Sequence, residues 1–281
     1  MYTLTQSALV RGSAGEPLPT VWHSLAAQGT VFRQGQLNLI CAGPGTGKSA
    51  FALSYALQSE VPTLYFSADS DAFTQLTRSI SNLVGLPLEE SARHVLEGNL
   101  AAYAADLEKV PIRLSYDASP SLDTIESLME SYEEVYGDYP ALVIVDNVTN
   151  VRAESADGDD PFSGLESLMD YFHTMARQTE ACTWGLHHVT GKYNDANEPI
   201  PLSGVKGQIT RVPEMVLTLH KRTSAFGQET LCVSTVKNRG GKADASGATY
   251  AELEFVGDTM QIRDATSAPN VDTEQDFDFG S

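Results

Sequence analysis

The chain has 281 residues, of which 42% are hydrophobic and 20% are charged, and its formal net charge is −19. This composition is typical of a packed globular protein, and the strong negative charge argues against broad electrostatic adhesion to nucleic acid or to an anionic membrane. The sequence has no run of about 18 apolar residues and no basic start followed by an apolar run, so it predicts neither a membrane span nor a signal peptide and favours the cytoplasm.

Residues 1–20 are poor in apolar residues and predict an N-terminal arm ahead of a core that spans 21–264. In the core, short apolar runs alternate with segments of helix-forming composition, and the first run, QLNLICA at 36–42, meets a glycine-rich turn. Further strands are predicted at 61–68, 111–116, 141–148 and 181–189. Helices are predicted at 49–59, 72–86, 91–110, 121–136 and 163–180, the last with an apolar stripe of Leu165, Leu168, Met169, Phe172, Met175 and Ala176.

The last third of the core is rich in strands. The strands predicted there are 214–222, 229–239 and 248–264. Strands that alternate with helices predict an α/β fold with a mostly parallel central sheet covered by helices on both faces, and the closing strands predict antiparallel additions toward the C-terminus. The three cysteines lie in or beside apolar runs without paired spacing, which favours buried, reduced thiols at Cys41, Cys182 and Cys232.

The stretch AGPGTGKS at 42–49 stands between the first predicted strand and the first predicted helix. A tight loop in this position turns several backbone N–H groups and the positive end of the helix dipole toward one concavity, which suits a polyphosphate. Lys48 is expected to neutralise phosphate charge and Ser49 to ligate Mg²⁺, although Ala42 stands where the usual pattern has its first glycine. The predicted nucleotide-binding residues are Gly43, Pro44, Gly45, Thr46, Gly47, Lys48, Ser49 and Ala50.

Two carboxylates are predicted to complete this site. Asp146 closes the apolar strand ALVIVD and, together with Ser49, is expected to hold the metal ion. Hydrolysis also needs a group that orients or deprotonates the attacking water. The stretch LYFSADSD places Asp69 at a strand end, which favours it as the catalytic carboxylate, whereas Ser70 or Asp71 suits the N-cap of the next helix.

Several stretches together resemble the RecA-like ATPase domain of DnaB-type replicative DNA helicases. They are FRQGQLNLICAGPGTGKSAFAL, TLYFSADSDAFTQLTRSI, FSGLESLMDYFHTMARQTEACTWGLHHV, TVKNRGG and the run that ends in ALVIVDNV. The resemblance extends from about Phe32 to Asp264 and implies a RecA-like P-loop NTPase that uses ATP and Mg²⁺ and assembles into a ring, expected to be a hexamer. Since no counterpart of the family's N-terminal helical domain precedes it, the chain resembles the compact phage or plasmid form.

The resemblance also implies roles for single residues. Asp69 falls at the place of the family's catalytic glutamate, with a side chain one methylene shorter. His188 falls at the γ-phosphate sensor, and Lys237 and Arg239 fall at the Lys-x-Arg element, whose cations reach the γ-phosphate of the neighbouring subunit. The expected catalytic residues are therefore Asp69, Lys48, His188, Lys237 and Arg239.

The loop at 190–208 resembles the channel-facing loop that binds single-stranded DNA in such rings. Lys192, Tyr193 and Lys206 in this loop, and Arg211 shortly after it, are the expected nucleic-acid contacts. A ring repeats each contact in every subunit, which reconciles DNA binding with an acidic chain.

The leading hypothesis is an ATP-driven, ring-forming DNA helicase or translocase in phage-type replication. Two alternatives stay open: a RecA-like recombination or annealing ATPase, and a non-motor regulatory ATPase of the KaiC kind. Residues 152–161 form an acidic loop near the expected place of another channel loop, and 265–281 form an acidic tail that we expect to be disordered. The tail alternates aspartate with phenylalanine, which leaves docking on a replication partner open.

Overall fold

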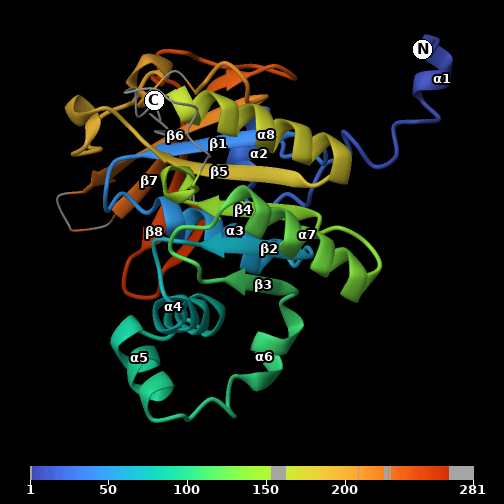
Figure 1. Ribbon diagram of the computed structural model, residues 1–281. Helices are drawn as coiled ribbons and strands as arrows, with labels where there is room; N and C mark the ends of the chain where they lie inside the picture. Colours follow the sequence, from blue (N-terminus) through green and yellow to red (C-terminus); the bar gives the residue numbers. More distant parts are fainter. Residues whose placement is uncertain (1, 153–162, 208, 225–226, 228, 266–281) are drawn as a thin grey trace, which may run out of the picture.

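A single sheet organises the core of the chain. The computed structural model describes residues 2–152, 163–207, 209–224, 227 and 229–265. Within these residues nine strands form one sheet in the order β3-β2-β4-β5-β1-β6-β7-β8-β9 (Figure 1). The strands from β3 to β6 in this order pair in parallel, and β7, β8 and β9 add antiparallel pairs at the β6 edge. The predicted α/β architecture with antiparallel strands toward the C-terminus is confirmed.

The parallel strands in the middle of the sheet are short apolar runs that are buried along their whole length, as expected where helices cover both faces. The three cysteines lie buried in β1, β5 and β7 with free thiols, as predicted. The strands are β1 (Leu37–Ala42), β2 (Thr63–Ser67), β3 (Ile112–Ser115), β4 (Leu142–Asp146), β5 (Cys182–His188), β6 (Met215–Thr223), β7 (Glu229–Asn238), β8 (Ala251–Val256) and β9 (Gln261–Asp264).

The longer helices begin and end close to the predicted residues. The apolar stripe predicted for the helix after residue 163 is buried in α8, and Asp71 caps α4 by accepting the Thr74 backbone N–H at 2.8 Å. The short helices α1 and α2 were not predicted, because four or five residues carry too little periodicity. The helices are α1 (Leu4–Ser7), α2 (His23–Ala27), α3 (Lys48–Ser59), α4 (Ala72–Val84), α5 (Leu88–Leu96), α6 (Ala104–Lys109), α7 (Leu122–Tyr136) and α8 (Ser163–Thr179).

Two predictions of continuous elements were wrong. The helix predicted at 91–110 is interrupted between α5 and α6, where Gly98 has a φ of 68° that a helix does not accommodate. The strand predicted at 248–264 is a hairpin of β8 and β9, because the chain turns after Val256 and the Thr259 N–H donates to the Val256 carbonyl at 3.1 Å. In both places turn-forming residues interrupt a stretch whose overall composition favours a single helix or a single strand.

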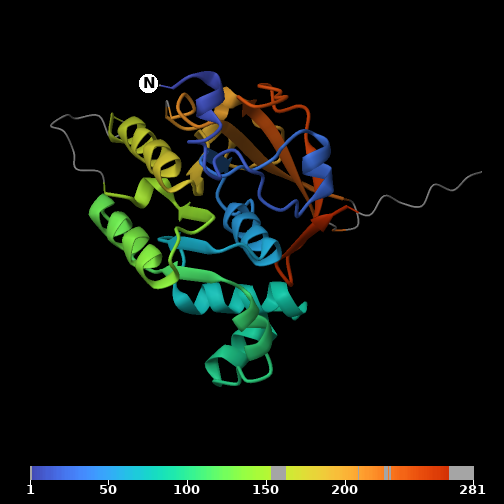
Figure 2. The same ribbon diagram turned by 90° about the vertical axis from the view of Figure 1, so that its right-hand side faces the viewer.

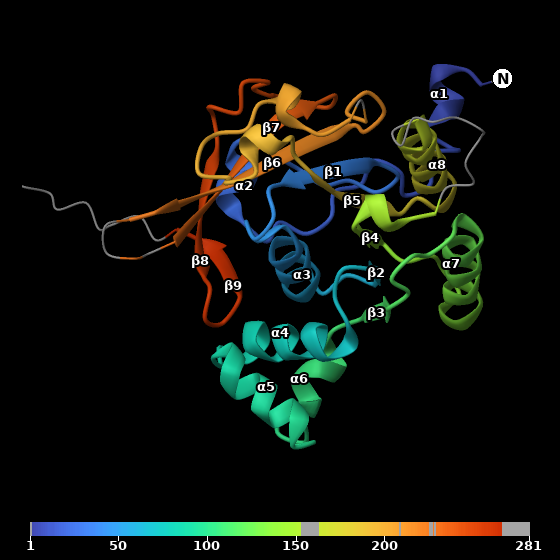
Figure 3. The ribbon, with the colours of Figure 1, turned by 60° about the vertical axis from the view of Figure 1, so that its left-hand side comes forward.

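The two faces of the sheet bury different sets of side chains. On the α3 face, the centroid of the Trp184 ring in β5 lies within 6 Å of the ring centroids of Phe32, Phe51 and Tyr55. On the other face, α7 and α8 pack their apolar sides against the sheet (Figure 3). Removing this apolar area from water is the main favourable contribution to the stability of the fold. The packed helices hold the sheet in place and so fix the positions of the residues that follow its strands.

Two parts of the chain extend from the sheet. Helices α5 and α6 lie beyond α4 on the β3 side, and the segment with α1 lies at the opposite end of the molecule (Figures 1 and 2). In α1 and just after it, Leu4 and Leu9 are exposed. Of the predicted acidic loop at 152–161 only Arg152 is described, and the predicted tail lies outside the described residues apart from Ala265. No helix in the described ranges has the length and apolar character needed to cross a membrane.

Candidate nucleotide-binding site

The turn between β1 and α3 has the backbone that a phosphate-binding loop needs. Gly45 and Gly47 have φ angles of 72° and 107°, which residues with a Cβ disfavour. Gly47 is the N-cap residue of α3, and the Thr46 hydroxyl donates to the Gly43 carbonyl oxygen at 2.8 Å. The free N–H groups of the first turn of α3 and its dipole are thus available to an anion held by the loop.

A cavity of about 530 Å³ lies at this loop. Its volume falls within the range of about 300–1,000 Å³ that is common for small-molecule and cofactor sites. Asp69 and His188, two of the expected catalytic residues, line the same cavity, whereas the Thr46 side chain is buried and does not line it. The expected nucleotide-binding residues that line it are Gly43, Pro44, Gly45, Gly47, Lys48, Ser49 and Ala50.

Lys48 and Asp146 place opposite charges close together beside the loop. Lys48 is 8% exposed and Asp146 is fully buried. Burial lowers the pKa of Lys48, and the carboxylates of Asp146 and Asp69 oppose this shift. Burial raises the pKa of Asp146, and the Ser49 hydroxyl and the Lys48 ammonium are the largest opposing effects. Each charged group thus stabilises the charged form of the other.

The surroundings of Asp146 fit a hydrated Mg²⁺ ion. The Tyr65 hydroxyl donates to Asp146 Oδ2 at 2.9 Å, while Oδ1 is buried and has no hydrogen-bond partner among the described residues. A buried carboxylate oxygen is costly to leave unpaired, and Mg²⁺ commonly takes one or two protein oxygens and completes its shell with water and phosphate. Asp146 Oδ1 and the Ser49 hydroxyl are therefore suitable ligands.

Asp69 and His188 reach the cavity from the ends of two parallel strands, β2 and β5, which lie on either side of β4. Asp69 follows β2, and its Oδ1 accepts a hydrogen bond from Asn150 Nδ2 at 2.9 Å. His188 ends β5, and the Asn147 side-chain amide donates to its Nε2 at 2.5 Å. Burial, followed by the nearby Lys48 charge, lowers the pKa of His188. The imidazole is therefore neutral at neutral pH and accepts rather than donates at Nε2.

Several residues of the site were not predicted. Asn147 and Asn150 follow Asp146 closely in sequence, and the available signal was the cluster of polar side chains after a strand end. Arg78 of α4 also lines the cavity, and its Nη1 donates to Ser70 Oγ at 3.3 Å. A single arginine in a helix carries no local signal of such a role, so only the packing of α4 revealed it.

The outer wall of the cavity comes from the antiparallel strands. Lys221 Nζ forms an ion pair with Glu229 Oε2 at 3.2 Å and lies 4.5 Å from the centroid of the Phe255 ring. All three residues line the cavity. They are far from the phosphate loop in sequence, and only the pairing of β6, β7 and β8 brings them there.

The loop expected to bind nucleic acid packs directly on the phosphate loop. A Cβ at Gly43 would lie 2.3 Å from the Asn194 carbonyl oxygen, so the two backbones approach closely only because Gly43 has no side chain. At the other end of the loop, His187 Nε2 donates to the Lys206 carbonyl oxygen at 2.8 Å. The segment at 190–207 is therefore attached both to the phosphate loop and to the strand that ends in the cavity.

The four expected nucleic-acid contacts differ in their surroundings. Lys192 and Lys206 have exposed side chains. Tyr193 is half-buried and packs against the apolar core, so its ring is only partly available for stacking. Arg211 forms an ion pair with Glu166 of α8 at 2.5 Å, which reduces the positive potential it presents to a phosphate.

Lys237 and Arg239 lie at the opposite end of the sheet from the phosphate loop. β7 ends beside the start of β1, because it pairs antiparallel with β6 and β6 pairs parallel with β1. The phosphate loop follows the other end of β1, after Ala42. Among the described residues that line the nucleotide cavity, neither cation occurs. The fold therefore does not bring them together with Lys48 and Asp69 within one chain.

Two solved structures resemble this fold. One is an isolated ATPase domain, which superposes with a TM-score of 0.73 at 16% identity, over 93% of this chain and 96% of that one. The other is a DnaB-like replicative helicase, described with its interactions with primase, which superposes with a TM-score of 0.72 at 15% identity over 93% of this chain. This chain spans 65% of the length of that helicase. The expected RecA-like helicase fold is confirmed.

Sequence comparisons extend the similarity beyond the fold. The Gene 65 protein of Mycobacterium phage L5 is 64% identical over 265 residues, which cover 94% of this chain and 99% of that protein. The family model described as the DnaB-like helicase C terminal domain matches residues 17–263. Because this match includes the phosphate loop and the whole sheet apart from the last residue of β9, the chain belongs to the family of DnaB-like helicase C-terminal domains.

Proposed function

We propose that this protein is an ATP-hydrolysing, ring-forming helicase or translocase that moves along single-stranded DNA in phage DNA replication. The observation that carries the proposal is the position of Arg239, which is exposed and lies at the end of the sheet opposite to the phosphate loop. A cation there cannot reach the nucleotide of its own chain. In a head-to-tail ring it would reach the γ-phosphate held by the next subunit.

The cavity supports ATP and Mg²⁺ as cofactors. Lys48 and the first N–H groups of α3 suit the β- and γ-phosphates. Ser49 and Asp146 would hold Mg²⁺, which when bound neutralises charge on the phosphate oxygens. Asp69 is the carboxylate that orients or deprotonates the attacking water, and Asn150 fixes its orientation.

Short contacts connect the nucleotide cavity with the loop expected to bind DNA. His188 lines the cavity, and the adjacent His187 donates to the Lys206 carbonyl oxygen. Gly43 of the phosphate loop lies against the Asn194 backbone. A change at the γ-phosphate would therefore displace backbone that belongs to the DNA loop, which is the physical coupling that a motor requires.

The proposal is tested by the steady-state ATPase rate per subunit, measured with and without single-stranded DNA over a range of protein concentrations. We expect the rate per subunit to rise steeply with concentration, because each site is completed by a neighbour, and to rise further with DNA. A rate per subunit that does not depend on concentration contradicts ring assembly. A rate that depends on concentration but ignores DNA contradicts the motor and favours a regulatory ATPase.

Gly43→Ala is expected to uncouple DNA binding from hydrolysis. The added Cβ would lie 2.3 Å from the Asn194 carbonyl oxygen, so the loop at 190–207 has to move away from the phosphate loop. The backbone shift that such overpacking forces typically lowers the stability of the folded protein by about 1–3 kcal/mol. We expect the DNA-induced increase in ATPase rate to fall by about tenfold, a loss that corresponds to about 1.4 kcal/mol of activation free energy.

Gly257→Ala is the matched control for this substitution. Gly257 lines the same cavity, but a Cβ there would lie 3.5 Å from Glu229 Oε2, an ordinary contact distance. We expect its stimulation by DNA to match that of the wild-type protein. Normal stimulation in Gly43→Ala would show that the contact with Asn194 does not transmit the signal.

A further inference from the structure

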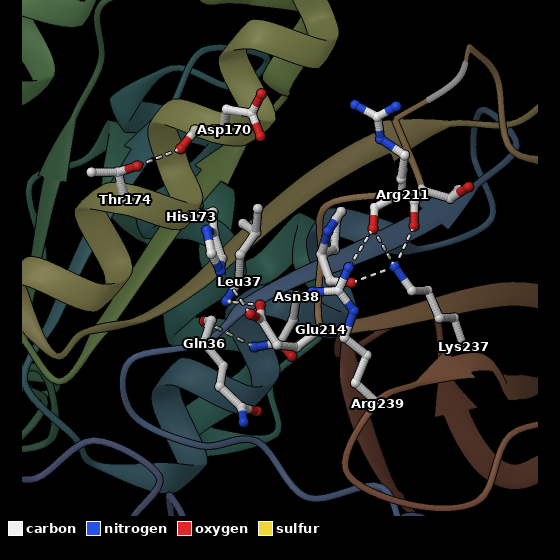
Figure 4. Close-up of polar contacts among 12 residues, drawn as sticks. Gln36, Leu37, Asn38, Asp170, His173, Thr174, Arg211, Glu214, Lys237 and Arg239 are labelled. Carbon is white, nitrogen blue, oxygen red and sulfur yellow. Dashed lines mark hydrogen bonds and ion pairs between the residues drawn. The ribbon is translucent and has the colours of Figure 1, made fainter. Parts of the chain in front are cut away.

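The ammonium group of Lys237 makes three contacts within its own chain. Lys237 lies near the end of β7 and is half-buried. Its Nζ donates to the carbonyl oxygens of Thr210, Arg211 and Pro213 at 2.6, 2.7 and 2.7 Å (Figure 4). All three acceptors belong to the segment 210–214, which leads into β6. The side chain thus holds this stretch of backbone against the end of β7.

These contacts occupy every donor that Lys237 has. A protonated lysine carries three N–H donors and no acceptor. Burial, with a smaller effect of the nearby Arg239 charge, lowers the pKa of Lys237 to about 8, so the ammonium form prevails at neutral pH. A phosphate from a neighbouring subunit would have to replace charge-assisted hydrogen bonds, and its binding would leave three carbonyl oxygens without this donor.

Arg239 is placed differently. Its side chain is exposed, and its one side-chain hydrogen bond among the described residues runs from Nη2 to the Arg211 carbonyl oxygen at 2.8 Å. A guanidinium carries five N–H donors in a planar fork that matches phosphate geometry. Of the two cations, Arg239 is therefore the one that has donors to offer to a phosphate.

Glu214 joins the same segment to the rest of the fold (Figure 4). Its Oε2 accepts the Leu37 N–H at 3.0 Å, and its Oε1 pairs with His173 Nε2 at 2.9 Å. Its carbonyl oxygen accepts the Arg239 N–H at 2.9 Å. The segment 210–214 therefore contacts both the backbone and the side chain of Arg239, and a displacement of the segment displaces that residue.

We propose that Lys237 is a positioning residue and not a second phosphate contact. It fastens the segment 210–214 to the end of β7 and so fixes the position of Arg239 within its own chain. Arg239 alone then supplies the cation that reaches the phosphate of the neighbouring subunit. The role given to Arg239 rests on the proposed function, whereas the fastening by Lys237 does not depend on it. The fastened segment also lies between Lys206, an expected DNA contact, and β6.

The fastening is tested by hydrogen exchange in the nucleotide-free full-length protein with the substitution Lys237→Met, which keeps the aliphatic stem and removes all three donors. We expect the backbone amides of Glu214 and Arg239 to exchange about tenfold faster than in the wild-type protein. Amides in the β1–β5 pairing should keep their rates, which shows that the fold is intact. Lys242→Met, at an exposed lysine, is the control. Unchanged exchange at both amides in Lys237→Met overturns the proposal.

Lys237→Arg separates positioning from phosphate contact. In Lys237→Met we expect ATPase activity to fall, because Arg239 loses its fixed position. A planar guanidinium cannot direct three donors from the point that Nζ occupies, so we expect Lys237→Arg to show fast exchange and an equal loss of ATPase activity. Recovery of wild-type ATPase activity in Lys237→Arg would overturn the proposal, because arginine binds phosphate well. If the wild-type protein hydrolyses no ATP under any condition, the proposed function fails, and the exchange rates still decide whether Lys237 fastens the segment.

Discussion

Lys48→Ala is expected to lower ATP hydrolysis by on the order of 10³-fold and to weaken nucleotide binding, since removal of a preorganised charge at a transferring phosphoryl group has effects of this size. Lys48 is 8% exposed in a cavity that also presents the carboxylate of Asp69, so without it the phosphates would meet negative charge that is not neutralised. Single-turnover hydrolysis and equilibrium nucleotide binding measure the two effects separately.

The fold should survive this substitution. The Asp146 carboxyl loses the Lys48 charge that opposes its raised pKa, and it can become protonated instead of remaining as a buried anion. We therefore expect a cooperative thermal unfolding transition in Lys48→Ala. Lys109→Ala, at an exposed lysine paired with Asp106, serves as the control with normal activity. Hydrolysis in Lys48→Ala within tenfold of the wild-type rate would show that the cavity is not the ATPase site.

Arg239→Ala is expected to lower hydrolysis by about 10³- to 10⁵-fold, the range found for arginine fingers that stabilise the transition state of phosphoryl transfer. Because Arg239 lies at the opposite end of the sheet from the phosphate loop, ATP binding within each chain should be retained. Arg263 is also exposed, and it pairs with Glu254. Arg263→Ala is therefore the control for loss of a surface arginine and should hydrolyse ATP normally.

Mixing two inactive variants tests whether Arg239 acts between subunits. Lys48→Ala subunits lack a working phosphate loop but keep Arg239, and Arg239→Ala subunits have the reverse defect. In mixed rings, the intact nucleotide site of some Arg239→Ala subunits would face a neighbouring Lys48→Ala subunit, which still carries Arg239. We therefore expect the mixture to hydrolyse ATP faster than either variant alone. Full ATPase activity of Arg239→Ala alone, or no recovery in stably mixed rings, would contradict the proposed role.

Local sequence patterns determined much of the fold and part of the site. The phosphate loop could be predicted because its glycines, Lys48 and Ser49 are adjacent in sequence and the flanking strand and helix have clear periodicities. Asp146 and Asp69 could be predicted as candidates because each follows a buried strand, and parallel strands bring their carboxyl ends to one edge of the sheet. In both cases the information lies within a few residues along the chain.

Tertiary pairing decided the remainder. The wall of Lys221, Glu229 and Phe255 depends on the register of three antiparallel strands, which no local pattern specifies. The sequence indicated that Lys237 and Arg239 belong together, but the folded chain gives Lys237 three backbone acceptors and leaves Arg239 exposed. A side chain's role depends on which donors and acceptors remain unpaired after folding, and contacts between residues distant in sequence determine which ones do.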